Sequence, residues 1–423
     1  MDPIIITLIL LAFAVVMFVT EKIPLALTSM IVCVGFILTG VLTPAQGFAG
    51  FVNANVILFV GMFIIGGALF DTGMANEIGG LITKFKFVKT ERQVIIAVML
   101  VSAVMSTFLS NTGTAAVLIP VIVGISAKTG IPRSKLLMSM LFIIIVAGNN
   151  SLIGAPGNLI AHAALEEATG RGFAFFEYGL VGFPLTIIAM LYMALFGYKL
   201  LPSRVPTAET FEQASDDYSH VPSWKRWLSL GLLLGTVFVM VFERQIGIPL
   251  HVASSIGAIL LVLTRVISEK QAYKAIDLKV IFLFGGTLAI GAALERSGAG
   301  AVIAGAVIGL LGEHAHPLAL LAAILVIAGG LTQFMSNTAT TALLVPVSMA
   351  IAQAMQADPS AAMAATVIGG SLAFTTPIAM PANTMIFAVG GFKFTDYVKA
   401  GLPMLILMMI MSFILLPIFF PFF

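Results

Sequence analysis

The chain has 423 residues, of which 60% are hydrophobic and 9% are charged, with a formal net charge of +2. Its mean hydropathy is +1.10, and its charged content lies far below the roughly 25% of soluble domains. This composition excludes a soluble globular domain and gives no basic surface for nucleic acid. A single cysteine, Cys33, excludes an intramolecular disulfide and a cysteine metal cluster. We therefore expect a membrane protein.

Ten apolar runs are long enough to cross a bilayer, which takes about 20 residues. They cover 3 to 20, 24 to 42, 55 to 72, 136 to 165 and 178 to 200, and then 228 to 243, 249 to 267, 279 to 296, 361 to 391 and 397 to 420. The first run follows no basic leader and no small-residue cleavage pattern, so we expect a retained membrane helix. The polar stretch 201 to 227 predicts a cytoplasmic linker between two halves.

Each half contains a further apolar stretch between its third and fourth crossings, at 93 to 126 and at 317 to 357. Ser-Asn-Thr interrupts both stretches near their middle. In the first half the two arms have about 14 to 17 residues, which is short for spanning helices at ~1.5 Å rise per residue. The pattern predicts a re-entrant hairpin with the polar motif at its tip.

The two halves repeat each other. Residues 106 to 121 closely match residues 332 to 347, and SLIGAPGN at 151 to 158 aligns with TPIAMPAN at 376 to 383. Five crossings per half is an odd number, so the second copy must be inverted in the membrane. We expect an all-α polytopic protein with inverted repeats at 1 to 200 and 228 to 423, each with five crossings and one hairpin.

The basic residues give the orientation. If the amino terminus is outside, eighteen of the 21 Lys and Arg residues fall on inner segments, and the three left outside are Arg171, Arg244 and Arg296. Cytoplasmic loops carry the excess of Lys and Arg. The sequence therefore predicts that both termini lie outside the plasma membrane.

The repeated motif also predicts a binding site. Hydroxyls and amides at membrane depth are costly unless they bind something, and a helix that starts at Ser-Asn-Thr offers free N–H groups to an anion. Glycine and proline interrupt the fourth crossings, 136 to 165 and 361 to 391, and such breaks are tolerated where they line a cavity. We expect two hairpin tips and two broken helices to meet about a pseudo-twofold axis.

The lack of ionisable residues at the predicted site indicates the coupling ion. The Ser-Asn-Thr tips and the interruptions at 148 to 157 and 375 to 381 contain no Asp, Glu, Lys, Arg or His, whereas proton-coupled carriers usually place an ionisable group in the membrane. Carbonyls freed at helix breaks, with Ser and Asn oxygens, suit sodium. The alternative is that the polar residues only cap buried helices. Two motifs at one offset, each paired with a broken helix, favour the binding site.

On these residues the chain resembles the divalent anion/sodium symporter family, INDY-like carriers of dicarboxylates, citrate and sulfate within the ion transporter superfamily. The resemblance implies a substrate site of Ser110, Asn111, Thr112 and Ser151 from one half, with Ser336, Asn337, Thr338, Thr376 and Pro377 from the other. It implies a first sodium site of Ser106, Ser110, Asn111 and a carbonyl near Asn150. It implies a second sodium site of Thr332, Met335, Ser336, Asn337 and Thr375. No cofactor is implied besides sodium as coupling ion.

The resemblance further implies a homodimer in which a transport domain moves as an elevator against a scaffold domain. The chain departs from the family in three respects. We expect it to lack the extra first helix of many relatives. It has single prolines in Gly-Ala-Pro-Gly-Asn at 154 to 158 and Met-Pro-Ala-Asn at 380 to 383, where the family often has a double proline, and Asn150 stands where glycine is common. These changes reshape the pocket wall, so succinate is not assumed as the substrate.

Other functions remain open at this point. A sodium-independent anion exchanger of the same fold is the nearest alternative to the symporter, and a cation/proton antiporter or an oxyanion efflux carrier comes after it. An enzyme is disfavoured, because the chain has no HExxH and no nucleophile dyad spacing, although His162 near Ser151 is a conceivable exception. Solvated or structural roles are expected for Asp71 and Glu295, with a part in the transport cycle as the alternative. Incidental roles are expected for His162, His314 and His316.

Overall fold

The computed structural model describes residues 2–20, 22–81, 90–204, 218, 221–311 and 317–421. Within these ranges every regular element is a helix, which confirms the prediction of an all-helical membrane protein. Most of the expected linker, and also His314 and His316, lie outside the described residues.

Seven helices of the described chain are long and apolar enough to cross a membrane. They are α1 (Pro3–Thr20), α4 (Ala54–Asp71), α6 (Glu91–Phe108), α7 (Asn111–Thr129), α11 (Ser223–Val241), α15 (Leu278–Ser297) and α21 (Phe394–Phe419). The apolar helices α2 (Leu25–Leu38), α10 (Gly179–Leu195) and α13 (Leu250–Leu263) are shorter.

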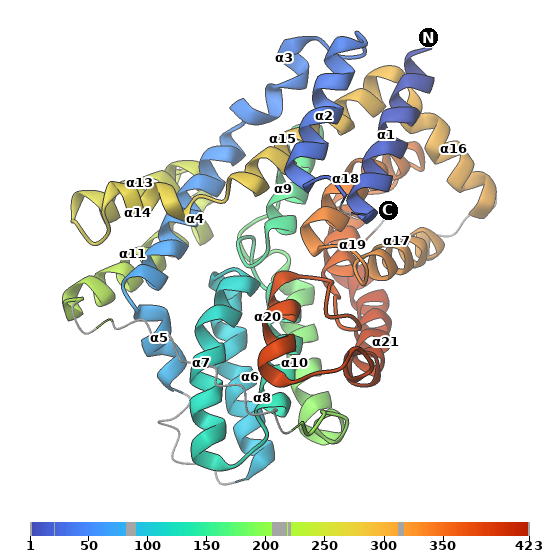
Figure 1. Ribbon diagram of the computed structural model, residues 1–423. Helices are drawn as coiled ribbons and strands as arrows, with labels where there is room; N and C mark the ends of the chain where they lie inside the picture. The colour runs from blue at the N-terminus through green and yellow to red at the C-terminus, as the bar shows by residue number, and fades with distance from the viewer. Residues whose placement is uncertain are drawn as a thin grey trace.

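One set of helices, the first helix group, consists of α1, α2, α4, α11, α13 and α15. In it α2 packs on α15, and α13 packs on α4. In the sequence repeat α2 corresponds to α13 and α4 to α15, so each helix packs on one from the other half (Figure 1). Both contacts are close because a glycine faces a serine. A Cβ at Gly61 would lie 2.6 Å from Cβ of Ser254, and a Cβ at Gly286 would lie 2.4 Å from Cβ of Ser29. Small residues allow this approach of membrane helices.

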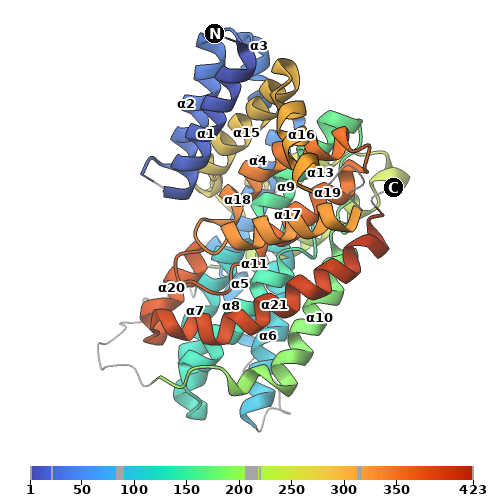
Figure 2. The same cartoon turned by 90° about the vertical axis from the view of Figure 1, so that its right-hand side faces the viewer.

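The second helix group contains the two hairpins and the two interrupted helices. Its members are the hairpins α6 with α7 and α17 (Pro317–Leu331) with α18 (Asn337–Ala354), the interrupted helices α8 (Arg133–Ala147) with α9 (Pro156–Thr169) and α19 (Pro359–Ser371) with α20 (Pro381–Gly390), and α10 and α21. Helix α6 packs on α8, and α17 packs on α19. Figure 2 shows α21 crossing this face beside α10 and α17.

Short helices complete the described chain. They are α3 (Pro44–Gly47), η1 (Ala49–Val52), α5 (Met74–Gly79), η3 (Gly197–Lys199), α12 (Glu243–Ile246), α14 (Glu269–Ala275) and α16 (Ala299–Leu311). Helix α14 packs on α4, and η1 packs on α15. Helices α14 and η1 therefore attach to long helices of the first helix group, whereas η3 packs on α10, and α16 packs on both α18 and α15.

Two expected boundaries are wrong. The arms of the first hairpin have 18 and 19 residues, not 14 to 17, because the helices continue into flanking polar residues. A capping box of Thr90 and Gln93 starts α6, and Gly130 ends α7. The arm length therefore gives no argument for a re-entrant hairpin over two crossings. The linker also ends early, because α11 begins at Ser223 and includes Trp224 to Trp227.

Candidate functional site

Each hairpin turns at a serine that caps the following helix. The hydroxyl of Ser110 accepts a hydrogen bond from the Gly113 N–H at 3.2 Å, and the hydroxyl of Ser336 accepts one from the Ala339 N–H at 3.2 Å. Both serines therefore act as N-caps. The N-cap interpretation is correct for the serines but leaves the asparagine and threonine of each motif for other contacts.

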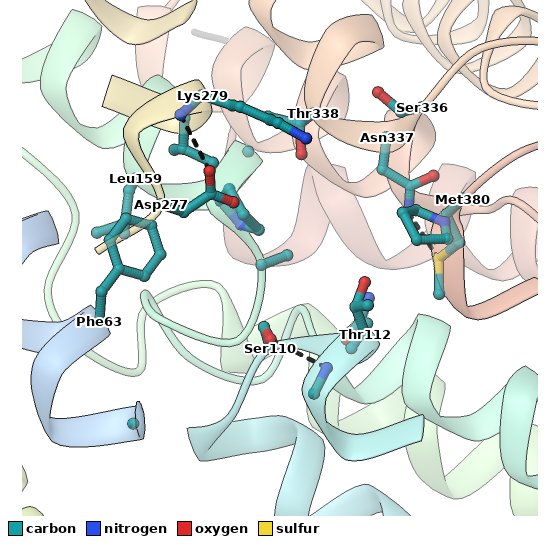
Figure 3. A pocket seen from close by; sticks show the side chains of 18 of the residues that line it. Phe63, Ser110, Thr112, Leu159, Asp277, Lys279, Ser336, Asn337, Thr338 and Met380 are labelled. Carbon is teal, nitrogen blue, oxygen red and sulfur yellow. Dashed lines mark hydrogen bonds between the residues drawn. The ribbon is translucent and has the colours of Figure 1, made fainter. Parts of the chain in front are cut away.

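The two tips face a common cavity of about 940 Å³. Ser110 and Thr112 project from one side of it, and Ser336, Asn337 and Thr338 from another (Figure 3). Asn111 also lines the cavity. All six residues of the two Ser-Asn-Thr motifs are thus brought together from segments that are 226 positions apart in sequence. The helices α7 and α18 both begin at this cavity.

Three predicted substrate residues lie outside the described lining of this cavity: Ser151, Thr376 and Pro377. The Ser151 hydroxyl donates to the Thr107 carbonyl at 2.5 Å, and the Thr376 hydroxyl donates to the Gln333 carbonyl. These hydroxyls therefore attach each helix break to the end of the adjacent hairpin arm. In this conformation Ser151 and Thr376 position the site rather than line it.

Two asparagines hold the breaks in shape. The Asn158 amide donates to the carbonyls of Gly148 and Ser151 at 2.9 and 2.7 Å. Its counterpart Asn383 donates to the carbonyls of Ala373 and Thr376 at 2.9 and 2.8 Å. Backbone carbonyls that lack helical partners need such donors. Both asparagines stand at matching positions in the two repeated halves of the chain, but their role was not predicted.

Oxygen atoms gather behind the first tip. The Ser106 hydroxyl donates to Asn111 Oδ1 at 2.7 Å and to the Ile144 carbonyl at 2.9 Å. A Cβ at Gly154 would lie 2.5 Å from the Gly148 carbonyl oxygen and 2.8 Å from that of Ser106. Only a glycine therefore fits against these two carbonyls. The result is a buried, uncharged set of oxygens directly behind the cavity.

The second tip repeats part of this arrangement. The Thr332 hydroxyl donates to Asn337 Oδ1 at 2.9 Å, and the Asn337 amide donates to the Ser371 carbonyl at 3.1 Å. Thr375 donates its N–H and its hydroxyl to Gln333 Oε1 at 2.9 and 2.8 Å. Thr332 and Met335 are fully buried behind the tip. Thr332 is thus bonded to Asn337, and Thr375 to Gln333, the neighbour of Thr332 in sequence.

The Asn150 side chain makes hydrogen bonds to neighbouring helices. Its amide donates to Thr107 Oγ1 at 3.1 Å, and its Oδ1 accepts from the Thr186 hydroxyl at 3.1 Å. Asn150 therefore connects the first break to the hairpin and to α10. The carbonyl predicted near Asn150 has a candidate in Gly148, and the Ser106 carbonyl, which was not predicted, lies against the same Gly154.

The opposite wall of the cavity belongs to the first helix group and carries charges. Its polar residues are Asp71 at the end of α4 and Gln271, Lys274, Asp277 and Lys279 around α14 and the start of α15. All four charged residues are exposed, so the cavity opens on this side. Sequence reasoning treated Asp71 as solvated or structural and missed its place in the wall. Glu295, its repeat counterpart, is outside the described lining.

His162 is buried, and its Nδ1 lies 3.0 Å from the Phe173 carbonyl. In the described chain it is also outside the cavity lining. A nucleophile pair with Ser151 is not formed, because the Ser151 hydroxyl donates to the Thr107 carbonyl instead. The geometry is that of a binding cavity between two helix N-termini.

Interrupted membrane helices that meet such a cavity define a secondary transporter of the ion transporter kind. Comparison with known families agrees: residues 15–369 match the family described as citrate transporter, CitMHS. Since the match covers most of the chain, the protein belongs to this family. The family and its relatives are multi-pass membrane transporters rather than enzymes.

The relatives are distant but cover most of the chain. An uncharacterized transporter of Haemophilus influenzae is 29% identical over 419 residues, covering 93% of this chain and 87% of its own. The sodium-dependent dicarboxylate transporter SdcS of Staphylococcus aureus is 23% identical over 422 residues, covering 90% of this chain and 79% of its own. These names agree with the resemblance found in the sequence.

Two solved structures share the fold. The YdaH transporter of Alcanivorax borkumensis aligns with a TM-score of 0.67 at 15% identity, covering 99% of this chain and 98% of its own. MtrF of Neisseria gonorrhoeae, described as illuminating a class of antimetabolite efflux pumps, aligns with a TM-score of 0.61 at 16% identity, covering 90% and 83%. At such identities the likeness concerns the fold alone.

Proposed function

We propose that the protein is a sodium-coupled symporter of a di- or tricarboxylate in the plasma membrane. The observation that carries this proposal is the meeting of two helix N-termini, those of α7 and α18, at one cavity whose tips are uncharged. Each N-terminus offers N–H donors and a partial positive charge to an anion. Two such ends fit a substrate with two separated carboxylates.

Sodium coupling is supported by the oxygens behind the tips. Sodium is a cargo of the cycle, and the first site would use Ser106, Ser110, Asn111 and the carbonyls beside Gly154. The second would use Thr332, Ser336, Asn337, Thr375 and the Met335 carbonyl. Asn111 and Asn337 belong to both the sodium sites and the substrate site. Binding of sodium therefore orders the side chains that the substrate needs, and binding of substrate orders those that sodium needs.

An elevator motion is supported by the division of the cavity walls. The tips belong to the second helix group, and the charged wall belongs to the first. On the other side, Asn55 of α4 donates a 2.7 Å hydrogen bond to Glu166 of α9 and joins the two groups. We interpret the conformation as open towards Lys274 and Lys279, which the positive-inside rule places in the cytoplasm. Both termini are then outside.

Two further features belong to the proposal. The resemblance supports a homodimer in the bilayer, with the first helix group as its scaffold. The second candidate function is sodium-independent exchange of carboxylates, because an exchanger could keep the same tips. Weaker alternatives are a cation/proton antiporter and an oxyanion efflux carrier. The tips carry no titratable group, which disfavours the antiporter.

A ligand panel tests the substrate class. Thermal stability of the purified protein is measured with malate, succinate, citrate, tartrate or sulfate, each in sodium or in potassium. A carboxylate that binds the folded state stabilises it by RT ln(1 + L/Kd), where L is the ligand concentration, so the unfolding temperature rises with the ratio of L to Kd. Stabilisation by a carboxylate only in sodium supports the symporter, and equal stabilisation in potassium supports the exchanger. Stabilisation by sulfate alone, or by none of the five anions, contradicts the carboxylate assignment.

A further inference from the structure

The wall opposite the tips breaks the sequence repeat in one respect. Asp277 caps α15 by accepting the Lys279 N–H at 3.0 Å, and Asn53 caps α4 by accepting the Asn55 N–H at 2.8 Å. The two helix starts are thus built alike, and Lys279 takes the place of Asn55. Asn55 is almost fully buried and bonded to Glu166. Lys279 instead lines the open cavity.

Lys279 occupies an unfavourable position for a cation. It is the second residue of α15, where the helix dipole favours negative charge. Among the described residues no carboxylate lies within 4.0 Å of its ammonium group. In Figure 3 its side chain extends over the cavity in the direction of Thr338. The positive-inside rule accounts for a lysine at this end of the protein, but the direction of the side chain over the cavity also places its charge where an anionic ligand would bind.

Lys274 shares this wall with Lys279. Among the described residues it too has no carboxylate within 4.0 Å, but the negative charge of Asp71 acts on it. Asp277 accepts the Lys279 N–H and is stabilised by the N-terminal end of α15. Lys279 is the residue whose side chain Figure 3 shows extending towards Thr338 of the second tip.

We propose that Lys279 is the specificity-determining residue that binds a third carboxylate of the substrate, while two other carboxylates lie on the tips. This inference rests on the proposed function and narrows it to tricarboxylates. Lys279 and the tip residue Thr338 line the same cavity, and the Lys279 side chain extends in the direction of Thr338 (Figure 3), so a ligand bound between them would contact both walls. A dicarboxylate would leave Lys279 in water.

The test uses two probes that differ by one carboxylate, tricarballylate and glutarate. Dissociation constants are measured by titration calorimetry on the full-length protein in sodium at about pH 8, where their carboxyl groups are ionised. Lys279→Gln is expected to weaken tricarballylate binding about tenfold, the size of one lost charge-assisted hydrogen bond, with little change for glutarate. Lys279→Arg is expected to retain the preference.

Lys270→Gln is the matched control, because Lys270 is an exposed residue of α14 outside the cavity lining. It is expected to change neither constant. An unchanged ratio of the two constants in Lys279→Gln overturns the inference, and so does an equal loss in Lys274→Gln, which would indicate general attraction by the wall. If the unmodified protein binds neither probe, the proposed function fails instead. Unfolding temperatures of all variants show that they are folded.

Discussion

The hydroxyl of Ser106 donates a 2.7 Å hydrogen bond to Asn111 Oδ1, and through it the arm before the first tip holds the asparagine that opens the next helix. Thr332 makes the same bond to Asn337 at 2.9 Å in the second hairpin. An asparagine fixed in this way directs its oxygen towards the preceding arm, and the Asn337 amide donates to the Ser371 carbonyl at 3.1 Å. The bond therefore joins the proposed substrate site to the proposed sodium sites.

Removal of this hydroxyl is expected to weaken sodium binding. In Ser106→Ala the sodium concentration for half-maximal uptake should rise about tenfold, or ~1.4 kcal/mol, because one oxygen is lost and Asn111 is released. Ser102→Ala is the matched control, since Ser102 is also buried on α6 and donates only to the Val98 carbonyl. Equal sodium dependence in the two variants would contradict the first sodium site.

Gly154 provides a second test of the same site. A methyl group at this position would lie against the carbonyl oxygens of Gly148 and Ser106 and would displace them. Gly154→Ala is expected to lower the apparent sodium affinity at least tenfold while the protein still folds, as its unfolding temperature would show. Gly124→Ala on α7 is the control, because a Cβ there meets no atom within 4 Å. A normal sodium response of Gly154→Ala would exclude these carbonyls as ligands.

One end of the second helix group is fastened by a partly buried ion pair. Arg204 donates to both carboxylate oxygens of Asp396 at 3.0 and 2.7 Å, and these bonds raise the pKa of Arg204. Asp396→Asn should lower the free energy of unfolding by more than the loss of an exposed pair does, because the buried Asp396 carboxylate gives up its charged hydrogen bonds to Arg204.

The corresponding surface pair serves as a control for that measurement. Arg171 and Glu177 are 3.4 Å apart, and 66% of the Arg171 side chain is exposed. Arg171→Gln should therefore cost less than about 1 kcal/mol. Both values come from chemical unfolding in detergent. Equal losses in the two variants would show that the Arg204 pair does not fasten this end.

Crosslinking tests the elevator motion. In a Cys33→Ala background, cysteines at Asn55 and Glu166 would join the two helix groups where they now form a hydrogen bond. Oxidation is expected to stop uptake, and reduction to restore it, because the groups could no longer separate there. Cysteines at Thr72 and Ser229, whose hydroxyls lie 3.1 Å apart within the first group, should leave uptake unchanged. Full activity of the oxidised Asn55 and Glu166 pair would contradict the motion.

The sequence was sufficient for the tips and breaks because each appears twice. Two copies of Ser-Asn-Thr, each followed by a Gly/Pro interruption, locate the cavity without any knowledge of packing. The charged wall could not be predicted in this way. Asp71 and Lys279 lie far apart in the chain and beside other polar residues, so their patterns resemble solvated helix ends. Only the packing of α14 on α4 brings them together.

The hairpin length was mispredicted for a local reason. Apolar runs measure the part of a helix that tolerates lipid, but α6 starts at Glu91 through its cap and α7 continues past Lys128 to Thr129. The orientation of Ser151, Thr376 and the Asn150 side chain also depends on neighbours that are distant in sequence. Hydroxyls at a break can face a ligand or the next helix, and the residue type does not distinguish these outcomes.

The most direct test of the account is uptake of labelled citrate and succinate into proteoliposomes with and without an inward sodium gradient. Accumulation above the external concentration in sodium, lost when potassium replaces it and lost in Asn111→Ala and Asn337→Ala, is the predicted result. Accumulation that is independent of sodium would contradict the symporter and favour the exchanger. Normal transport by both asparagine variants would contradict a site formed between the two tips.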